Sequence, residues 1–324
     1  AWEDRAATLR QFREIDEYRG ESTDWLATYS LPLSLHFRGM MGIAPDDADA
    51  AQRALDAVRD SGAGFGFGAL AAGADILLAE ALVACDAELH VFLPVIASRF
   101  REQSVAPYGD SWLARFDRLF EQAASVTVVA AVERLTQTGV AFAAQVAKGA
   151  AIENAKRLES VVRGIELKDM ASTASESGND IFLSVARSVA RDPTTLTDGE
   201  WLVMLLADTP GPDTKNWQRV AETFWIHNAP SMEAAAEELA ATQASVPAAR
   251  VAMMATAVEA SGDAELCRAR ALRMVQCAAP GLAIADSCTA RALLSTRPEM
   301  RLEPWGELPD AAGAIEIYSI EPQG

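Results

Sequence analysis

The segment from Gly62 to Pro94 constrains the fold of this chain more than any other. It begins with four glycines in seven residues, at positions 62, 64, 66 and 68, and continues through the apolar run Ile76–Ala84 to a second apolar run, Leu89–Leu93. Glycine lets a backbone turn tightly and approach a ligand closely. The run Ile76–Ala84 is too uninterrupted for a strand and too short to span a membrane. This order predicts a glycine loop, a buried helix and a strand, as in doubly wound α/β folds.

The predicted glycine loop is a candidate site for an anion. The N-terminus of the following helix would point at the loop, where free N–H groups and the helix dipole favour phosphate. We expect Gly66, Gly68 and Gly73 to bind the phosphate, with Gly39 and Asp75 beside the sugar or base. Two plainer interpretations stay open: the glycines only allow strand and helix to pack, and Asp75 only caps the helix.

Glu80 is the second charged residue of this segment and lies within its apolar run. An ionised, buried glutamate needs a partner. Either Glu80 reaches the pocket, or it pairs with an arginine elsewhere, Arg38 being one candidate. In the first case the protein would be a nucleotide hydrolase, with Glu80 as the acid/base and Arg38 steadying the phosphate.

Gly66-x-Gly68-x-x-Ala71 nearly fits a dinucleotide fingerprint, but no acid for the ribose ends the next strand, at Leu93-Pro94. NAD is therefore disfavoured, and we predict no cofactor.

Strands and helices alternate over residues 31–170. Further strands are expected at Ser34–Met41, Ser125–Ala131 and Val161–Leu167, and helices at 45–62, 110–120 and 140–158. This alternation predicts a doubly wound, mainly parallel, Rossmann-like sheet with helices on both faces. Residues 1–30 are expected to form a helical lead whose apolar stripe, Leu9, Phe12 and Ile15, must pack on something.

Residues 171–199 are rich in Ser, Thr, Gly and Asp and are expected to be a linker with a short helix at Ile181–Val189. Residues 200–324 are expected to form an α+β domain. Its predicted strands are 201–207, 220–226, 250–258, 282–285, 300–308 and 314–320, and its predicted helices begin at 231, 263 and 287.

Two resemblances support this division. Gly66–Glu80, continued by Ala87–Pro94, resembles the SLOG branch of Rossmann-like domains, which implies binding or processing of a nucleotide or nucleotide-derived messenger over about residues 34–167. The motif Pro-Gly-Gly-x-Gly-Thr-x-x-Glu of the sugar-releasing enzymes in the wider group is absent. The second half is similar to a class III adenylate/guanylate cyclase homology domain in its element order and in Arg268–Met274, Pro280–Ala285, Pro304–Leu308 and Ile315–Tyr318.

The second resemblance implies a degenerate domain. Cyclases hold two metal ions with two aspartates. Asp208 fits one of these positions, no carboxylate follows Thr223–Ile226 to supply the other, and Ala269 stands where the family has Asn. Arg273 matches the family's arginine. Class III cyclase domains pair through their sheet faces, so we expect a homodimer in which Trp201, Phe224 and Trp225 supply apolar surface.

Composition narrows the class of partner. The net charge of −18 argues against nucleic acid and anionic membranes. Four separated cysteines, with no metal-binding spacing and no visible signal peptide or membrane span, favour a reducing cytoplasm. A chain that begins at Ala1 is expected to be part of a longer protein. The sequence predicts a bacterial signalling protein that binds a nucleotide-type small molecule and carries a silent, cyclase-like pseudoenzyme domain. The alternatives are the Glu80 hydrolase, an active cyclase and a purely structural module.

Overall fold

The computed structural model describes residues 2–29, 31–130, 132–169, 180–185, 200–221, 223–258, 261–310 and 313–321. The chain divides into two compact units, each described by itself below. Most of the predicted linker, 171–179 and 186–199, lies outside the described residues, and the residue ranges of the domains stay a prediction. No helix in the described part of the chain is long and apolar enough to cross a lipid bilayer.

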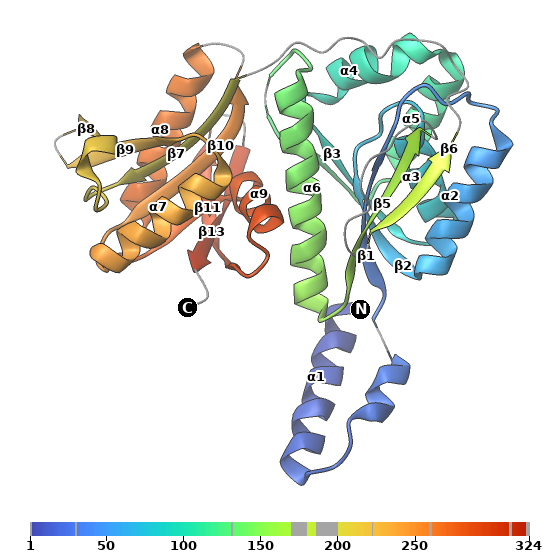
Figure 1. The fold of residues 1–324 in the computed structure, drawn as a ribbon, viewed down its shortest axis with the longest axis horizontal. Coiled ribbons are helices and arrows are strands. Elements are labelled where there is room, and N and C mark those ends of the chain that lie inside the picture. The colour runs from blue at the N-terminus through green and yellow to red at the C-terminus, as the bar shows by residue number, and fades with distance from the viewer. Residues whose placement is uncertain are drawn as a thin grey trace. The chain divides into compact units, whose positions relative to one another are not determined.

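A six-stranded, mainly parallel sheet forms the first unit, as predicted (Figure 1). Its strand order is β4-β3-β2-β1-β5-β6, and the pairs β3/β2, β2/β1, β1/β5 and β5/β6 are parallel. The strands are β1 (Leu33–Gly39), β2 (Ala63–Gly68), β3 (Glu88–Leu93), β4 (Ser125–Val128), β5 (Val162–Asp169) and β6 (Ile181–Val185). The segment expected to be a helix at 181–189 is therefore a strand where it is described, because Ile181–Val185 pairs with Ile165–Asp169.

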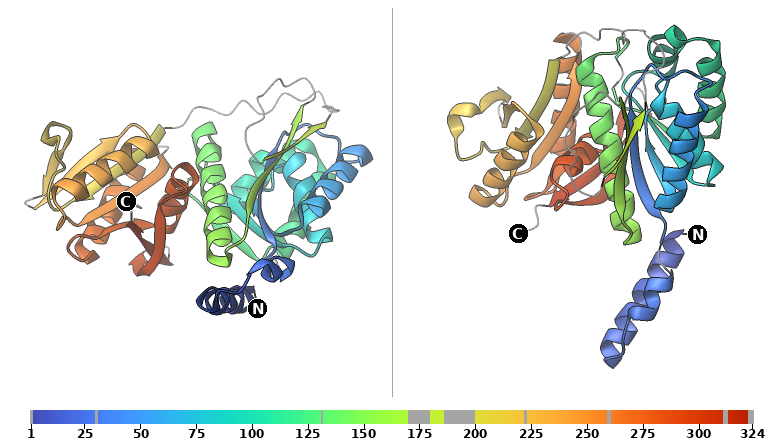
Figure 2. Two further views of the ribbon diagram at one scale, coloured as in Figure 1. Left: turned by 60° about the horizontal axis from the view of Figure 1, so that its bottom comes forward. Right: turned by 45° about the vertical axis from the view of Figure 1, so that its right-hand side comes forward.

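Helices cover both faces of this sheet, with α2 and α3 on one side and the C-terminal half of α6 on the other (Figure 2). The helices in this part of the chain are α1 (Trp2–Arg19), α2 (Ala48–Ser61), α3 (Ala74–Ala84), α4 (Ala97–Phe100), α5 (Asp110–Gln122) and α6 (Gln137–Leu158). The short helical turns are η1 (Asp24–Tyr29), η2 (Arg101–Val105) and η3 (Ala106–Tyr108).

The caps of α2 follow the sequence signals. The Asp47 carboxylate accepts a hydrogen bond from the Ala50 N–H at 2.9 Å, which satisfies one of the free donors of the first turn. Gly62 ends the helix in the left-handed conformation, with φ 68°, which a residue with a Cβ adopts rarely. The expected helix between Pro45 and Gly62 is confirmed.

The glycine-rich stretch differs from the prediction. Residues 63–68 form strand β2 and not a loop, so glycines and phenylalanines alternate between the two faces of the sheet. A Cβ at Gly66 would lie 2.2 Å from Leu82 Cδ1 of α3, and one at Gly68 would lie 2.5 Å from the Phe37 carbonyl oxygen. Phe67 stacks on His90, with ring centroids 4.8 Å apart. The glycines thus let α3 and β1 approach β2 closely.

The second unit contains a seven-stranded mixed sheet of order β12-β13-β11-β10-β7-β9-β8. Only β10/β11 is parallel among its pairs, and the others are antiparallel. The strands are β7 (Glu200–Ala207), β8 (Gln218–Ala221), β9 (Phe224–Ala229), β10 (Val251–Val258), β11 (Ala283–Asp286), β12 (Arg301–Asp310) and β13 (Gly313–Glu321). The segment predicted as one strand, 220–226, is instead divided between β8 and β9, which pair as a hairpin.

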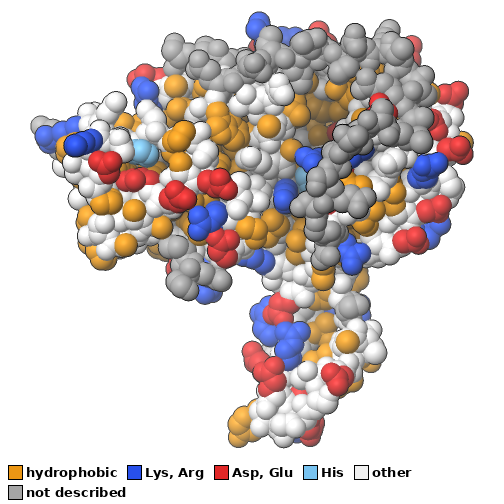
Figure 3. All heavy atoms as spheres, viewed as in Figure 1, with side chains coloured by type: hydrophobic (Ala, Val, Ile, Leu, Met, Phe, Trp, Pro, Cys, Tyr) orange, Lys and Arg blue, Asp and Glu red, His pale blue; other side chains and the backbone are white. Residues whose placement is uncertain are grey.

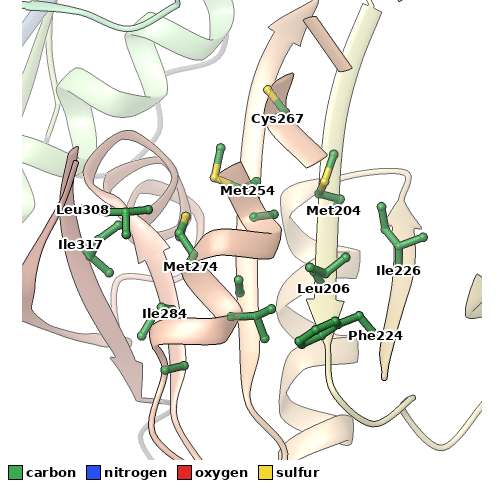
Figure 4. Packing of buried hydrophobic residues seen from close by; sticks show 14 residues of the cluster. Met204, Leu206, Phe224, Ile226, Met254, Cys267, Met274, Ile284, Leu308 and Ile317 are labelled. Carbon is green, nitrogen blue, oxygen red and sulfur yellow. The ribbon is translucent and has the colours of Figure 1, made fainter. Parts of the chain in front are cut away.

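Both faces of the central strands of this sheet are buried. Helix α8 (Ser261–Cys277) covers one face, where Met204, Met254 and Met274 lie close together in the apolar cluster of Figure 4. Helices α7 (Met232–Ser245) and α9 (Ser287–Thr296) also pack on β7 and β10, respectively, and η4 is Thr214–Asn216. Burial on both faces explains why β7 and β10 are continuous apolar runs.

The aromatic surface expected to support pairing is partly covered. Phe224 belongs to the apolar cluster beneath α8, and Trp201 packs edge-to-face on Phe142, with ring centroids 5.0 Å apart. Trp225 is half-buried, and Arg219 lies 5.9 Å from its ring centroid. The homodimer stays a prediction.

Helix α1 buries little of its predicted apolar stripe. Phe12 and Ile15 are 44% and 46% exposed, and charges of both signs are interspersed along the helix (Figure 3). Ion pairs of Arg10 and Arg13 with Glu159, together with the pair Glu3–Arg157, attach α1 to the end of α6. Polar contacts therefore hold the helical lead more than apolar burial does.

We expect Gly66→Ala to lower the free energy of unfolding by roughly 1–3 kcal/mol, because the added Cβ would lie 2.2 Å from Cδ1 of the fully buried Leu82. Leu82→Ala alone should cost roughly 2–5 kcal/mol. The double variant should cost less than the sum, since Leu82→Ala removes the clash. Urea unfolding measures all three values; strict additivity would contradict the contact.

Candidate functional site

The chain reverses its direction of progress across the first sheet between β1 and β5. From β1 it moves through α2 to β2 on one side, whereas from β4 it moves through α6 to β5 on the other. Ligands of open α/β sheets bind outside the carboxyl ends of the strands at this switch point. We call the charged and glycine residues found there the switch-point site; they are Arg38, Gly39, Asp75, Glu166 and Lys168.

Two glycines bring the N-terminus of α3 to the carboxyl end of β1. A Cβ at Gly39 would lie 2.4 Å from Ala74 Cβ and 2.8 Å from the Leu167 carbonyl oxygen. Gly73 has φ 108°, and a Cβ there would lie 2.8 Å from the Met40 carbonyl oxygen. The Ala74 N–H donates to that same oxygen at 3.0 Å. These contacts leave no room for side chains, so glycine is required at both positions.

The first turn of α3 keeps backbone donors without acceptors. Gly73 is the N-cap and offers no side chain to the helix. The Ala74 N–H is bonded to Met40, whereas the N–H groups of Asp75 and Ile76 have no acceptor in the described part of the chain. Unpaired N–H groups and the helix dipole make such a terminus favourable for negative charge.

Asp75 is a buried carboxylate that is only half satisfied. Its side chain accepts one hydrogen bond through Oδ2, from the Ala71 N–H at 3.3 Å, while Oδ1 is buried and has no partner in the described part of the chain. The residue is 7% exposed. Burial raises the pKa of Asp75 to about 7, against the lowering effects of the Ala71 and Gly39 N–H groups and of Arg38. The interpretation of Asp75 as the helix cap is wrong, because Gly73 occupies that position.

Two cations share one acid at the carboxyl ends of β1 and β5. Arg38 of β1 contacts Glu166 of β5 at 2.8 Å, and the Lys168 ammonium lies 3.6 Å from the same carboxylate. Lys168 also lies 4.0 Å from the centroid of the Phe182 ring on β6. Because Arg38 is 59% exposed at its side chain, it can reorient toward a ligand. Arg38, Lys168 and Glu166 together carry one positive charge, to which Asp75 adds a negative charge when it is ionised.

The structure does not gather all five expected ligand-binding glycine and aspartate residues into one site. Gly39, Gly73 and Asp75 lie together at the N-terminus of α3, whereas the Cβ position of Gly66 faces Leu82 within the sheet–helix interface. Gly68 ends β2 with its Cβ position against Phe37. The packing interpretation therefore fits Gly66 and Gly68. The strict alternation of Gly and Phe over 64–68 has the period of a strand and could have indicated this.

Glu80 pairs with arginines of α5 and not with Arg38. Arg115 Nε donates to Glu80 Oε1 at 2.9 Å, and both Arg115 Nη2 and Arg118 contact the same carboxylate. Arg115 also donates to the Pro45 carbonyl oxygen at 3.0 Å. The alternative that Glu80 pairs with an arginine is therefore confirmed, but the candidate Arg38 is wrong, because Glu80 lies on the side of α3 that packs on α5, while Arg38 contacts Glu166.

Asp208, the expected vestigial metal ligand, is bound to protein groups. Its carboxylate accepts from the Arg250 N–H at 3.0 Å and from Arg250 Nε at 2.8 Å, which joins the end of β7 to the start of β10. Arg273 contacts Asp310 at 3.2 Å, together with Arg270. Among the described residues, no group of three or more His, Cys, Asp and Glu could hold a metal ion.

The sequence analysis did not predict Glu166 and Lys168 as residues of the site. They flank Leu167, where the predicted strand ends, and they alternate in the manner of strand residues that share one face. Nothing in a single sequence says that this strand lies beside β1. Their charge at a predicted carboxyl end of a strand was the available signal.

Comparisons with known proteins add little to this geometry. No protein-family model matches the chain, and no curated protein matches it. A crystal structure of an adenylate/guanylate cyclase/hydrolase from Silicibacter pomeroyi is similar to part of it, with 11% sequence identity and a TM-score of 0.32 over 40% of this chain and 100% of that chain. This likeness is too low to carry an argument about function.

We expect Asp75→Asn to stabilise the protein above pH 7. The folded pKa of about 7 exceeds the ordinary value of 3.8, so the native state keeps a proton that the unfolded state has lost between these values. The contribution of Asp75 to the stability of the wild type should therefore fall from about pH 4 to about pH 7 and then level off. The cost at the plateau is on the order of 4 kcal/mol.

Urea unfolding from about pH 4 to about pH 8 tests this expectation, with Asp47→Asn as the control for loss of a carboxylate near a helix N-terminus. The gain of Asp75→Asn should grow with pH and be largest near pH 8. If Asp75→Asn were less stable than the wild type at pH 8, the expectation that the charged Asp75 carboxylate costs stability would be wrong.

Proposed function

We propose that this protein binds a nucleotide or nucleotide-derived anion at the switch-point site. The observation that carries the proposal is the N-terminus of α3, where two N–H groups without acceptors lie beside a buried, half-satisfied carboxyl group. A bound anion would take up those donors. The location at the carboxyl ends of β1 and β5 is the place where doubly wound sheets bind such ligands.

Local charge supports an anion despite the acidic chain. Arg38 and Lys168 both contact Glu166, so these three side chains together carry one positive charge although the chain carries a net charge of −18. Phosphate on the N–H groups of Asp75 and Ile76 would gain from the helix dipole as well as from the exposed Arg38 guanidinium. Gly39 and Gly73 allow the strand and the helix terminus to approach each other.

A nucleotide is proposed over a simple anion by analogy. The wording of residues 66–94 resembles SLOG domains, and the fold is of the doubly wound class that binds nucleotides in many proteins. In this proposal the protein is a signalling component, and binding rather than chemistry is its activity. The cyclase-like second domain serves dimerisation or regulation.

The hydrolase alternative lacks an acid/base in the right place. Glu80 is held by two arginines of α5, which take up its oxygen atoms. Arg38 lies at the carboxyl end of β1 with Glu166, so the two residues named for hydrolysis do not act together. Anion binding at the N-terminus of α3 requires neither the release of Glu80 from its arginines nor the approach of Glu80 to Arg38.

A nucleotide that binds this site should raise the melting temperature, since a hundredfold excess over Kd stabilises by about 2.7 kcal/mol. Arg38→Gln removes one charged hydrogen bond to the ligand, so it should lower the affinity for that nucleotide by about tenfold. Arg59→Gln is the matched control, because it removes one exposed arginine from the last turn of α2, where Arg59 pairs with Asp56.

The measurement is a thermal-shift screen of ATP, ADP, GTP, GDP and cyclic nucleotides on the three proteins. The proposal requires a shift in wild type and Arg59→Gln that is reduced in Arg38→Gln. It fails when no nucleotide shifts wild type, or when both arginine variants behave alike.

The second domain should release no cyclic nucleotide. Asp208 is committed to Arg250, and Ala269 stands at the position of the expected Asn. Incubation with ATP or GTP and Mn²⁺ should give no product above a heat-denatured control. Asp208→Ala should instead lower the free energy of unfolding by roughly 1–3 kcal/mol, because Arg250 loses its acceptor. Steady cyclic-nucleotide production that Asp208→Ala abolishes would overturn this expectation.

A further inference from the structure

The Asp75 carboxyl group has no use in the fold itself. It does not cap α3, it makes no ion pair, and its Oδ1 atom is buried without a partner among the described residues. A buried carboxyl group that costs stability and has one oxygen atom without a partner is expected where function requires it. The question is what this oxygen atom meets when the site is filled.

Two features of the site conflict if Asp75 is charged. The N–H groups of Asp75 and Ile76 favour an anion, yet a carboxylate on the side chain of Asp75 itself repels the same anion. A protonated carboxyl group removes the conflict, because it can donate a hydrogen bond where the carboxylate can only accept. The orphan oxygen then gains a partner, and the ligand gains a third donor beside the two backbone groups.

We infer that the anion bound at the switch-point site accepts a hydrogen bond from the protonated carboxyl group of Asp75, so that binding is coupled to the uptake of one proton. This inference rests on the proposed function, which it deepens by assigning Asp75 as a proton-carrying contact. The site would favour ligand oxygen atoms that carry charge without a proton, as do the non-bridging oxygen atoms of the α-phosphate in a nucleoside di- or triphosphate. The affinity would fall as the pH rises.

The neighbouring elements contain few groups that could produce the same coupling. β1 brings His36 and Arg38, β5 brings Arg163, Glu166, Lys168 and Asp169, and β2 contains no ionisable residue. α5 brings Arg115 and Arg118, both on Glu80. The charged residues of α2 are all exposed; they are Asp49, Arg53, Asp56, Arg59 and Asp60. His36 of β1 has an ordinary pKa in the neutral range, and it is tested separately below.

Burial gives Asp75 the right range for this role. Because burial raises its pKa to about 7, the group is partly protonated in neutral solution and an anion can complete the protonation. Above that pH, each pH unit should reduce the affinity of a one-proton site by up to about tenfold. Below about pH 6 the affinity should level off.

The test is isothermal titration of sulfate, ADP and GDP into wild type, Asp75→Asn and His36→Gln between about pH 5.5 and about pH 8.5, in buffers of different ionisation enthalpy. The amide group of Asn can donate a hydrogen bond without taking up a proton, so Asp75→Asn should bind with little change in affinity near pH 6. Any proton uptake that remains in Asp75→Asn therefore reports protonation of the ligand itself. We expect wild type and His36→Gln to take up close to one proton more than Asp75→Asn near pH 8.

Each outcome decides one of the two proposals. Binding to wild type with the same proton uptake as Asp75→Asn overturns the inference and leaves the proposed function standing. Uptake that disappears in His36→Gln but persists in Asp75→Asn also overturns it. If none of the three probes binds wild type at any pH and no nucleotide shifts its melting temperature, the proposed function fails and the inference fails with it.

Discussion

The close approach of α3 to strands β1 and β2 is the contact on which the first unit depends. It requires backbone without side chains at Gly39, Gly66 and Gly73, where an added Cβ would lie 2.2–2.8 Å from neighbouring atoms. The interior of a protein is packed too densely to absorb such overlaps cheaply. One consequence is structural, a tightly packed helix and sheet. The other is chemical, because the same contacts hold the N-terminus of α3 against the carboxyl end of β1.

That placement explains why an unsatisfied acid is tolerated at Asp75. The packing of α3 fixes the position of its first turn, so the carboxyl group stays buried although burial disfavours its charge. The stability lost at Asp75 is small compared with the stability that α3 gains by burying almost all of its apolar side chains. Strain of this kind is common at functional sites. It is the reason why the switch-point site is the strongest candidate in the described part of the chain.

The second unit uses charged residues differently. Asp208, Arg250, Arg273 and Asp310 satisfy one another at the ends of strands and on α8, and they leave no carboxylate cluster for a metal ion among the described residues. The core between α8 and the sheet is made of methionine and other apolar side chains. These contacts account for a stable mixed sheet. They do not require any bound ligand, in contrast to the half-satisfied donors and acceptor at α3.

Local sequence determined the helices, most strands and the fold class, because caps such as Asp47 and Gly62 and apolar runs such as Ile76–Ala84 act within a few residues. It failed at 63–68, where glycine suggested a loop but tertiary packing against Leu82 uses it in a strand. Only the tertiary structure decided the partners: Glu80 meets α5, and Arg38 meets Glu166 of β5. Strand order joins residues 128 positions apart, and no local pattern encodes that distance.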